Sequence, residues 1–267
     1  MSLYPTPIVV KPSAHEVSDG KLSQRNLEIA TRALARDGLV VLEDLIDFES
    51  LDRLNDKMVQ DAYHLQSLKD SPFNYNKGNI QQDPPMTAEW FDGSIYTITM
   101  TPENGSTGGF VQLHTRGMNT DIWTEIWLGT HRNTTIADQE GAHGERASGR
   151  IKPDLLQAQR ALRGPCQPVI KKGSIIVRDL RLWHGGKPNY STEPRVMLAM
   201  IHFASWYRNQ MNVEFAEELK EQLKVERTGL QAAATYVPQD QLLQNYLSRP
   251  YGNAYNFDQT EKIGGVF

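Results

Sequence analysis

The sequence has one cysteine, no long hydrophobic run and little net charge, and each of these features excludes a class of protein. Cys166 alone cannot form an intrachain disulfide framework, which argues against a secretory history. A formal net charge of −4 gives no electrostatic footprint for nucleic acid or an anionic membrane. The N-terminus lacks a signal-peptide pattern, and no apolar stretch is long enough to span a bilayer. We therefore expect a cytoplasmic protein that binds a small molecule.

The length and composition predict a single folded domain. With 267 residues, of which 39% are hydrophobic, the chain can bury one large core. Residues 1–24 contain proline and serine with little periodicity, so we expect an N-terminal arm. Residues 25–267 then form the domain. Its helical tail over 236–257 is expected to pack on the domain or at the edge of a homodimer.

Hydrophobic periodicity predicts several helices and one early strand. The apolar spacing over 27–36 suits an amphipathic helix, which Asp37-Gly38 ends. The run Leu39–Leu42 is typical of a buried strand. Further helices are expected over 48–68, 153–162 and 214–226.

Residues 173–207 are the stretch around which the rest of the chain is expected to be organised. Residues 174–177 and 195–203 are rich in β-branched and large apolar side chains, and the segment 185–189 between them is a dense turn signal. The pattern predicts two strands joined by a polar loop. His184 would then lie at a strand end, where rigidity is combined with access.

The residue types at 184 and 195 suit a metal and an acid. A neutral imidazole such as that of His184 binds divalent transition metals, and the guanidinium of Arg195, eleven residues later, can bind a carboxylate in bidentate geometry. The alternative is that His184 makes a local hydrogen bond and Arg195 a surface ion pair.

Two motifs carry a resemblance to a known family. The run Leu182-Trp183-His184-Gly185-Gly186-Lys187-Pro188-Asn189-Tyr190-Ser191, followed by Pro194-Arg195, resembles the distal-histidine motif of the phytanoyl-CoA dioxygenase-like family. The run Glu125-Ile126-Trp127-Leu128-Gly129-Thr130-His131-Arg132 is similar to that family's Pro-Gly-Ser-His turn. The resemblance covers residues 25 to 258 and is closest to a fungal subgroup.

The resemblance implies a fold and a chemistry. Members of the family are Fe(II)- and 2-oxoglutarate-dependent oxygenases. The implied fold is mainly β with flanking helices, a double-stranded β-helix, which is a cupin-like jelly roll. By the resemblance, His184 is an iron ligand and Arg195 binds the far carboxylate of 2-oxoglutarate. The implied reaction is C–H oxidation of a small organic molecule, such as a secondary metabolite.

The sequence departs from the family at the first metal-binding motif. An iron centre of this class needs a His-x-Asp or His-x-Glu before the Gly-Thr-His turn, and none is present there. His114 has Arg116 where an acid belongs. His143-Gly144-Glu145 is the one His-x-acid, but it follows the turn, so His143 and Glu145 are a fallback pair of ligands. His131 is interpreted as a turn residue.

One hypothesis explains the missing motif. Thr107 and Glu125 would join into a continuous family-like segment if residues 108–124 were removed. We therefore interpret 108–124 as a translated retained intron, accompanied by loss of an exon that encoded the His-x-Asp strand. The alternative is a rebuilt loop in an inactive protein.

Two other functions stay open at this point. The first is a catalytically inactive jelly-roll protein that binds a small molecule without iron, because one histidine cannot hold Fe(II) with useful affinity. The second is a metal-dependent isomerase or epimerase on the same barrel, which would need the same missing ligands.

Overall fold

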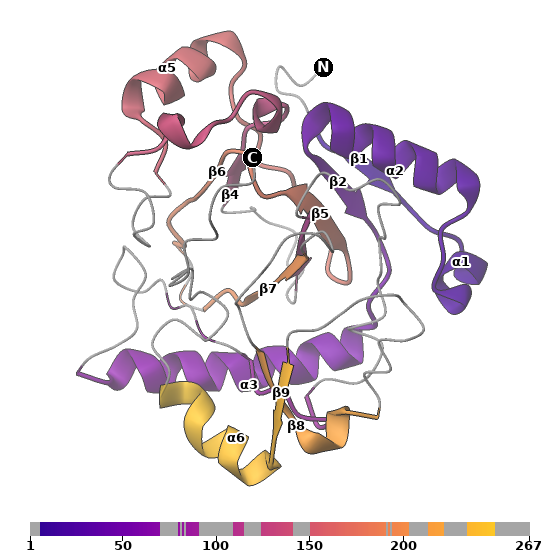
Figure 1. The fold of residues 1–267 in the computed structure, drawn as a ribbon, viewed down its shortest axis with the longest axis vertical. Coiled ribbons are helices and arrows are strands. Elements are labelled where there is room, and N and C mark those ends of the chain that lie inside the picture. Colours follow the sequence, from indigo (N-terminus) through magenta and orange to yellow (C-terminus); the bar gives the residue numbers. More distant parts are fainter. Residues whose placement is uncertain are drawn as a thin grey trace, which may run out of the picture.

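The computed structural model describes residues 6–69, 80, 82, 84–90, 109–114, 124–140, 150–190, 192, 194–202, 213–221 and 234–248. These residues form mixed sheets with flanking helices (Figure 1). None of the helices in the described ranges combines the length and the apolar character that a bilayer span needs.

The N-terminal part of the chain forms two strands and three helices. The predicted arm contributes β1 (Ile8–Val10) and α1 (Ala14–Asp19). The next helix, α2 (Gln24–Asp37), confirms the helix predicted over 27–36. It ends because Gly38 adopts a left-handed conformation with φ 77°, from which its N–H reaches the Leu34 carbonyl. The strand β2 (Leu39–Leu42) and the helix α3 (Phe48–Ser67) follow as predicted.

Five strands form the main sheet, in the order β1-β2-β5-β3-β7. β1 runs parallel to β2, and the other neighbours are antiparallel. The three strands that complete this sheet are β3 (Gly109–His114), β5 (Ile175–Asp179) and β7 (Met197–His202). We call this unit the five-stranded sheet.

Two cores pack against opposite faces of the five-stranded sheet. On the outer face, Val40 and Val177 pack with Ala30 of α2 and Leu54 of α3, so these helices cover that face. The inner face carries the alternate residues of β2 and β5, which pack against the segment after β4. The members of this inner core are Leu39, Val41, Ile126, Leu128, Cys166, Ile170, Ile176 and Leu182.

A second sheet faces this inner core. It is a two-stranded antiparallel pair of β4 (Thr124–Ile126) and β6 (His184–Gly186), which we call the β4–β6 ribbon. The strands predicted over 174–177 and 195–203 are confirmed as β5 and β7, but they do not pair with each other as a hairpin. β3 lies between β5 and β7, and residues 184–186 pair with β4 in a different sheet.

The C-terminal elements pack on α3. β8 (Val213–Ala216) pairs in parallel with β9 (Ala234–Val237), and α6 (Gln239–Asn245) follows; Figure 1 shows all three beside α3 at the lower end of the view. The helix predicted over 214–226 is wrong at its start, because pairing with β9 makes 213–216 a strand. The Tyr246 hydroxyl, just after α6, donates a hydrogen bond to Asp61 of α3 at 2.8 Å and links these elements to that helix.

Two further elements complete the described chain. α5 (Pro153–Leu162) confirms the helix predicted over 153–162, and proline occupies its first turn, where its missing N–H is not needed. Within the span interpreted as a retained intron, residues 109–114 form β3. The intron hypothesis concerns the gene, and it stays a prediction.

Candidate functional site

His184 lies where the chain leaves the five-stranded sheet for the β4–β6 ribbon. A turn ends β5: the Leu182 N–H donates to the Asp179 carbonyl at 3.1 Å, and Asp179 Oδ1 accepts from the Arg181 N–H at 2.8 Å. Two residues later His184 pairs with Ile126 across the ribbon. Cross-strand partners share a face, and Ile126 belongs to the inner core, so His184 is on the face turned toward the five-stranded sheet.

The imidazole of His184 is held in one tautomer. Its Nδ1 lies 2.9 Å from the Leu182 carbonyl oxygen, and a carbonyl can only accept, so Nδ1 carries the proton. Burial lowers the pKa of His184 to about 3, and the nearby Arg178 guanidinium adds to this effect. The residue as a whole still has accessible surface. At neutral pH Nε2 therefore offers its lone pair, as a metal ligand requires.

Arg178 is a buried cation on the same side of the five-stranded sheet. Alternation along β5 puts Ile175 and Val177 on the outer face and Ile176 with Arg178 on the inner face. Only 4% of Arg178 is exposed, and burial lowers its pKa to about 10. Sequence reasoning missed this residue. The signal was a charged side chain that directly follows a run of three apolar residues in the strand.

Arg195 lies just before β7, at the edge of the five-stranded sheet. It is partly buried, and burial lowers its pKa. His184 and Arg195 do not share a hairpin, since His184 belongs to the β4–β6 ribbon and β7 pairs with β3. The joint role of the two residues in one site stays a prediction.

The acidic residue beside His184 on the partner strand points the other way. Glu125 of β4 faces Gly185, not His184, so strand alternation puts its carboxylate on the opposite face of the ribbon. There it accepts a contact from Lys187 at 2.7 Å and another from Arg160 at 3.6 Å. Glu125 is therefore an ion-pair residue of the outer surface and not a partner for His184 in binding a metal.

The other candidate histidines fall in three different situations. His131 is buried in the short turn Thr130–Arg132, with Nε2 3.2 Å from the Ala35 carbonyl oxygen, in agreement with its interpretation as a turn residue. His114 ends β3, and its side chain lies outside the described residues. His143 and Glu145 also lie outside the described residues.

The described residues supply one ligand and do not complete an iron site. Among them, no group of three histidine, cysteine, aspartate or glutamate side chains lies close enough to hold a metal ion. The site thus consists of one neutral imidazole with an open Nε2 and a buried guanidinium nearby. This arrangement can contribute a nitrogen ligand and attract an anion, and any further metal ligands must come from other residues of the chain.

Comparison with known proteins gave distant structural likenesses. No family model matches the sequence. A crystal structure of EctD from S. alaskensis with 2-oxoglutarate and 5-hydroxyectoine is 14% identical, with a TM-score of 0.45, over 76% of this chain and 87% of that chain. The epimerase SnoN, in complex with Fe3+, alpha ketoglutarate and nogalamycin RO, is 11% identical, with a TM-score of 0.39, over 68% and 84%. At these scores the function must be argued from this chain's own residues.

Proposed function

We propose that this chain is an Fe(II)- and 2-oxoglutarate-dependent oxygenase that oxidises a small organic molecule on a double-stranded β-helix. The observation that carries the proposal is His184: a neutral imidazole whose Nδ1 is fixed by the Leu182 carbonyl, so that the lone pair for a metal is on Nε2. The two-layer arrangement supports the fold, because the five-stranded sheet and the β4–β6 ribbon enclose one inner core.

In this proposal each residue has a limited task. His184 would bind Fe(II) through Nε2, while its Nδ1–H, held by Leu182, fixes the ring plane. Arg195 would bind the far carboxylate of 2-oxoglutarate, as the sequence motif implies. Arg178 adds a buried positive charge on the inner side of the sheet. The bound iron and 2-oxoglutarate would supply the oxidising chemistry.

The proposed family, substrate, location and oligomeric state rest on the sequence. The run around Trp183-His184-Gly185 and the Gly-Thr-His turn support a place in the phytanoyl-CoA dioxygenase-like family, in its fungal subgroup, with a secondary metabolite as substrate. The single cysteine supports a cytoplasmic location, and a homodimer is part of the same proposal. A single domain over 25–267 is part of the same proposal.

A second candidate is a small-molecule-binding barrel that holds no iron. The observation that favours it is the lack, among the described residues, of any three-ligand group around His184. Such a protein would retain His184 and Arg195 as a binding site for an organic acid. The two candidates differ in metal binding, which can be measured directly.

The deciding experiment is an anaerobic titration of the full chain with Fe(II) and 2-oxoglutarate. The oxygenase proposal predicts a weak visible charge-transfer band that is lost in His184→Ala and retained in His64→Ala, which removes an exposed histidine from the last turn of α3. Arg195→Ala should raise the 2-oxoglutarate concentration needed for the band.

The other outcomes separate the candidates. Calorimetric binding of 2-oxoglutarate without a band would support the barrel without iron. A band that survives in His184→Ala, or binding of neither component by folded protein, would overturn the oxygenase proposal. Loss of the band in His143→Ala and Glu145→Gln would assign the remaining ligands to the fallback pair.

A further inference from the structure

We propose a second binding site, for a small carboxylic acid with an apolar body, in a surface hollow between α5 and the C-terminal end of α2. The hollow has a volume of about 830 Å3, which lies in the range of small-molecule sites. It is lined by residues of α2, the Thr130–Arg132 turn and α5, together with Trp183. The site does not depend on the proposed oxygenase function.

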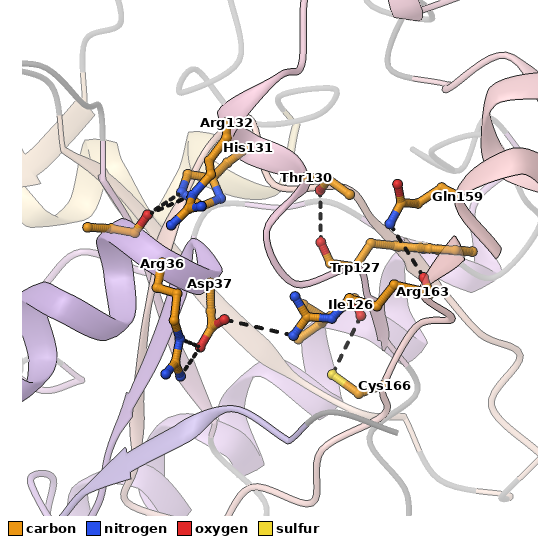
Figure 2. Close-up of polar contacts among 11 residues, drawn as sticks. Arg36, Asp37, Ile126, Trp127, Thr130, His131, Arg132, Gln159, Arg163 and Cys166 are labelled. Carbon is orange, nitrogen blue, oxygen red and sulfur yellow. Dashed lines mark hydrogen bonds and ion pairs between the residues drawn. The ribbon is translucent and has the colours of Figure 1, made fainter. Parts of the chain in front are cut away.

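One wall of the hollow is an anchored pair of arginines. Asp37 is 3% exposed, and its Oδ2 accepts from Arg36 Nε at 3.0 Å and Nη2 at 2.6 Å, while Arg163 Nη2 lies 3.8 Å from Oδ1. Figure 2 shows the two guanidinium groups on either side of the Asp37 carboxylate. A guanidinium has five N–H donors, so Asp37 can orient both groups and leave donors for a ligand.

Gly129 leaves space for the guanidinium of Arg163. Gly129 has a left-handed backbone with φ 89°, and a Cβ built there would lie 3.3 Å from Arg163 Nη1. Its N–H donates to the Asp37 carbonyl at 2.8 Å, which ties the turn to the end of α2. The guanidinium of Arg163 therefore lies directly against backbone at the mouth of the hollow.

Another part of the lining is a face of α5 that carries two leucines and a glutamine. Leu155, Gln159 and Leu162 follow one another at i, i+4 and i+7 on α5, and all three line the hollow. No residue of α5 is buried, and Leu162 is 83% exposed. Leu162 therefore offers accessible apolar surface to a ligand in the hollow.

The charge balance identifies the head group. The lining contains Arg36, Arg132 and Arg163 against Asp37 and Asp138, which leaves one net positive charge. A monocarboxylate neutralises that charge, whereas a phosphate dianion would exceed it. Arginine also matches a carboxylate in bidentate geometry. The single net positive charge and the leucine side chains of α5 together favour an organic acid with an apolar tail.

The test is calorimetric titration of the iron-free full chain with octanoate. We expect one site per chain, and Arg163→Gln should weaken the affinity about tenfold or more because a charged hydrogen bond is lost. Arg160→Gln is the matched control. It lies on the same helix with 42% of its side chain exposed against 40% for Arg163, but it pairs with Glu125 and stacks on Trp127. This control should leave octanoate affinity unchanged.

A second pair of variants tests the apolar part of the lining. Leu162→Asp should abolish octanoate binding without unfolding the chain, since Leu162 contributes little packing, while Val169→Asp, 64% exposed and outside the hollow, should not affect it. Octanol should bind at least about tenfold more weakly than octanoate, because it carries no charge for the arginines.

Three results would overturn the proposal. The first is equal affinity for octanoate and octanol. The second is octanoate binding that persists in both Arg163→Gln and Leu162→Asp. The third is a wild-type dimer that Leu162→Asp converts to a monomer. The last result would assign the hollow to a second copy of the chain. None of these results depends on iron, so the oxygenase proposal could fail while this one stands.

Discussion

The five-stranded sheet and the β4–β6 ribbon differ in how tightly their residues are held. All four residues of β2 are at most 1% exposed, and both of their faces are covered. In β6, by contrast, His184 and Gly186 are exposed, and a Cβ added at Gly185 or Gly186 would meet no atom within 4 Å. β2 is thus enclosed in the core, whereas β6 carries His184 at an accessible position of the ribbon.

The largest expected effect comes from cutting into the five-stranded sheet. Leu42 is 1% exposed and pairs with Ile175, so Leu42→Ala should lower the free energy of unfolding by about 2–5 kcal/mol through lost burial and a residual cavity. Urea denaturation at neutral pH measures this loss. Leu162→Ala makes the same chemical change at an 83% exposed site and should cost less than about 0.5 kcal/mol. Equal losses would remove the distinction between core and surface.

Alanine substitutions at two glycines, Gly38 beside the five-stranded sheet and Gly185 in the ribbon, compare how tightly the two regions are packed. Gly38 has φ 77°, and a Cβ there would lie 2.5 Å from His131 Nδ1 and 2.8 Å from Leu182 Cδ1. Gly38→Ala should therefore cost about 2–4 kcal/mol, from backbone strain and overpacking together. Gly185→Ala, in open space, should change stability by less than about 0.5 kcal/mol. A ribbon glycine as sensitive as Gly38 would show that the ribbon is as tightly packed as the sheet.

The same contrast explains what could be predicted from sequence. The apolar run 39–42 and its Asp-Gly stop are local signals, and both were confirmed because burial on two faces needs no knowledge of the partner. The strand at 213–216 was missed because its charged, helix-like pattern is overridden by pairing with residues 234–237. Pairing of His184 with Ile126 in a separate ribbon is likewise a long-range choice that no local pattern contains.

The site shows a similar division between local and long-range information. His184 and Arg195 were identified from their residue types and motif, but the tautomer of His184 depends on the position of the Leu182 carbonyl, which only the turn fixes. Arg178 became a candidate only when β5 was seen to lie inside the five-stranded sheet, with Arg178 on the face turned to the ribbon. Residue type predicts the chemistry, and the fold decides which side chains meet.

Asp179 lies at the junction of the two regions and gives a pH-dependent prediction. Its buried position raises the pKa of its carboxyl, but hydrogen bonds from Arg181 outweigh this and hold that pKa below the ordinary 3.8. The unfolded chain therefore takes up the proton more readily. The stabilisation is present above pH 3.8 and is lost as the pH falls through the lower folded value.

Replacing Asp179 should remove this stabilisation. Asp179→Asn is expected to cost about 1–3 kcal/mol at neutral pH, since a buried acceptor of three Arg181 hydrogen bonds is altered while Arg181 itself stays half exposed. Stability measured in urea below pH 4 should then fall less steeply than in the wild type. Asp154→Asn, at an exposed position of α5, is the control and should follow the wild-type curve. A parallel curve for Asp179→Asn would contradict the assigned pKa shift.

The smallest loss of stability is expected at His184, which lies in the β4–β6 ribbon. His184 lies at an accessible position of β6, and the one side-chain hydrogen bond that it makes among the described residues, to the Leu182 carbonyl, can be replaced by water, so His184→Ala should shift the free energy of unfolding by less than about 0.5 kcal/mol. The same variant should lose binding of Fe(II) with 2-oxoglutarate. A loss above about 2 kcal/mol would identify His184 as a packing residue. A variant that keeps its stability but loses ligand binding would show that the His184 side chain serves ligand binding and not the fold.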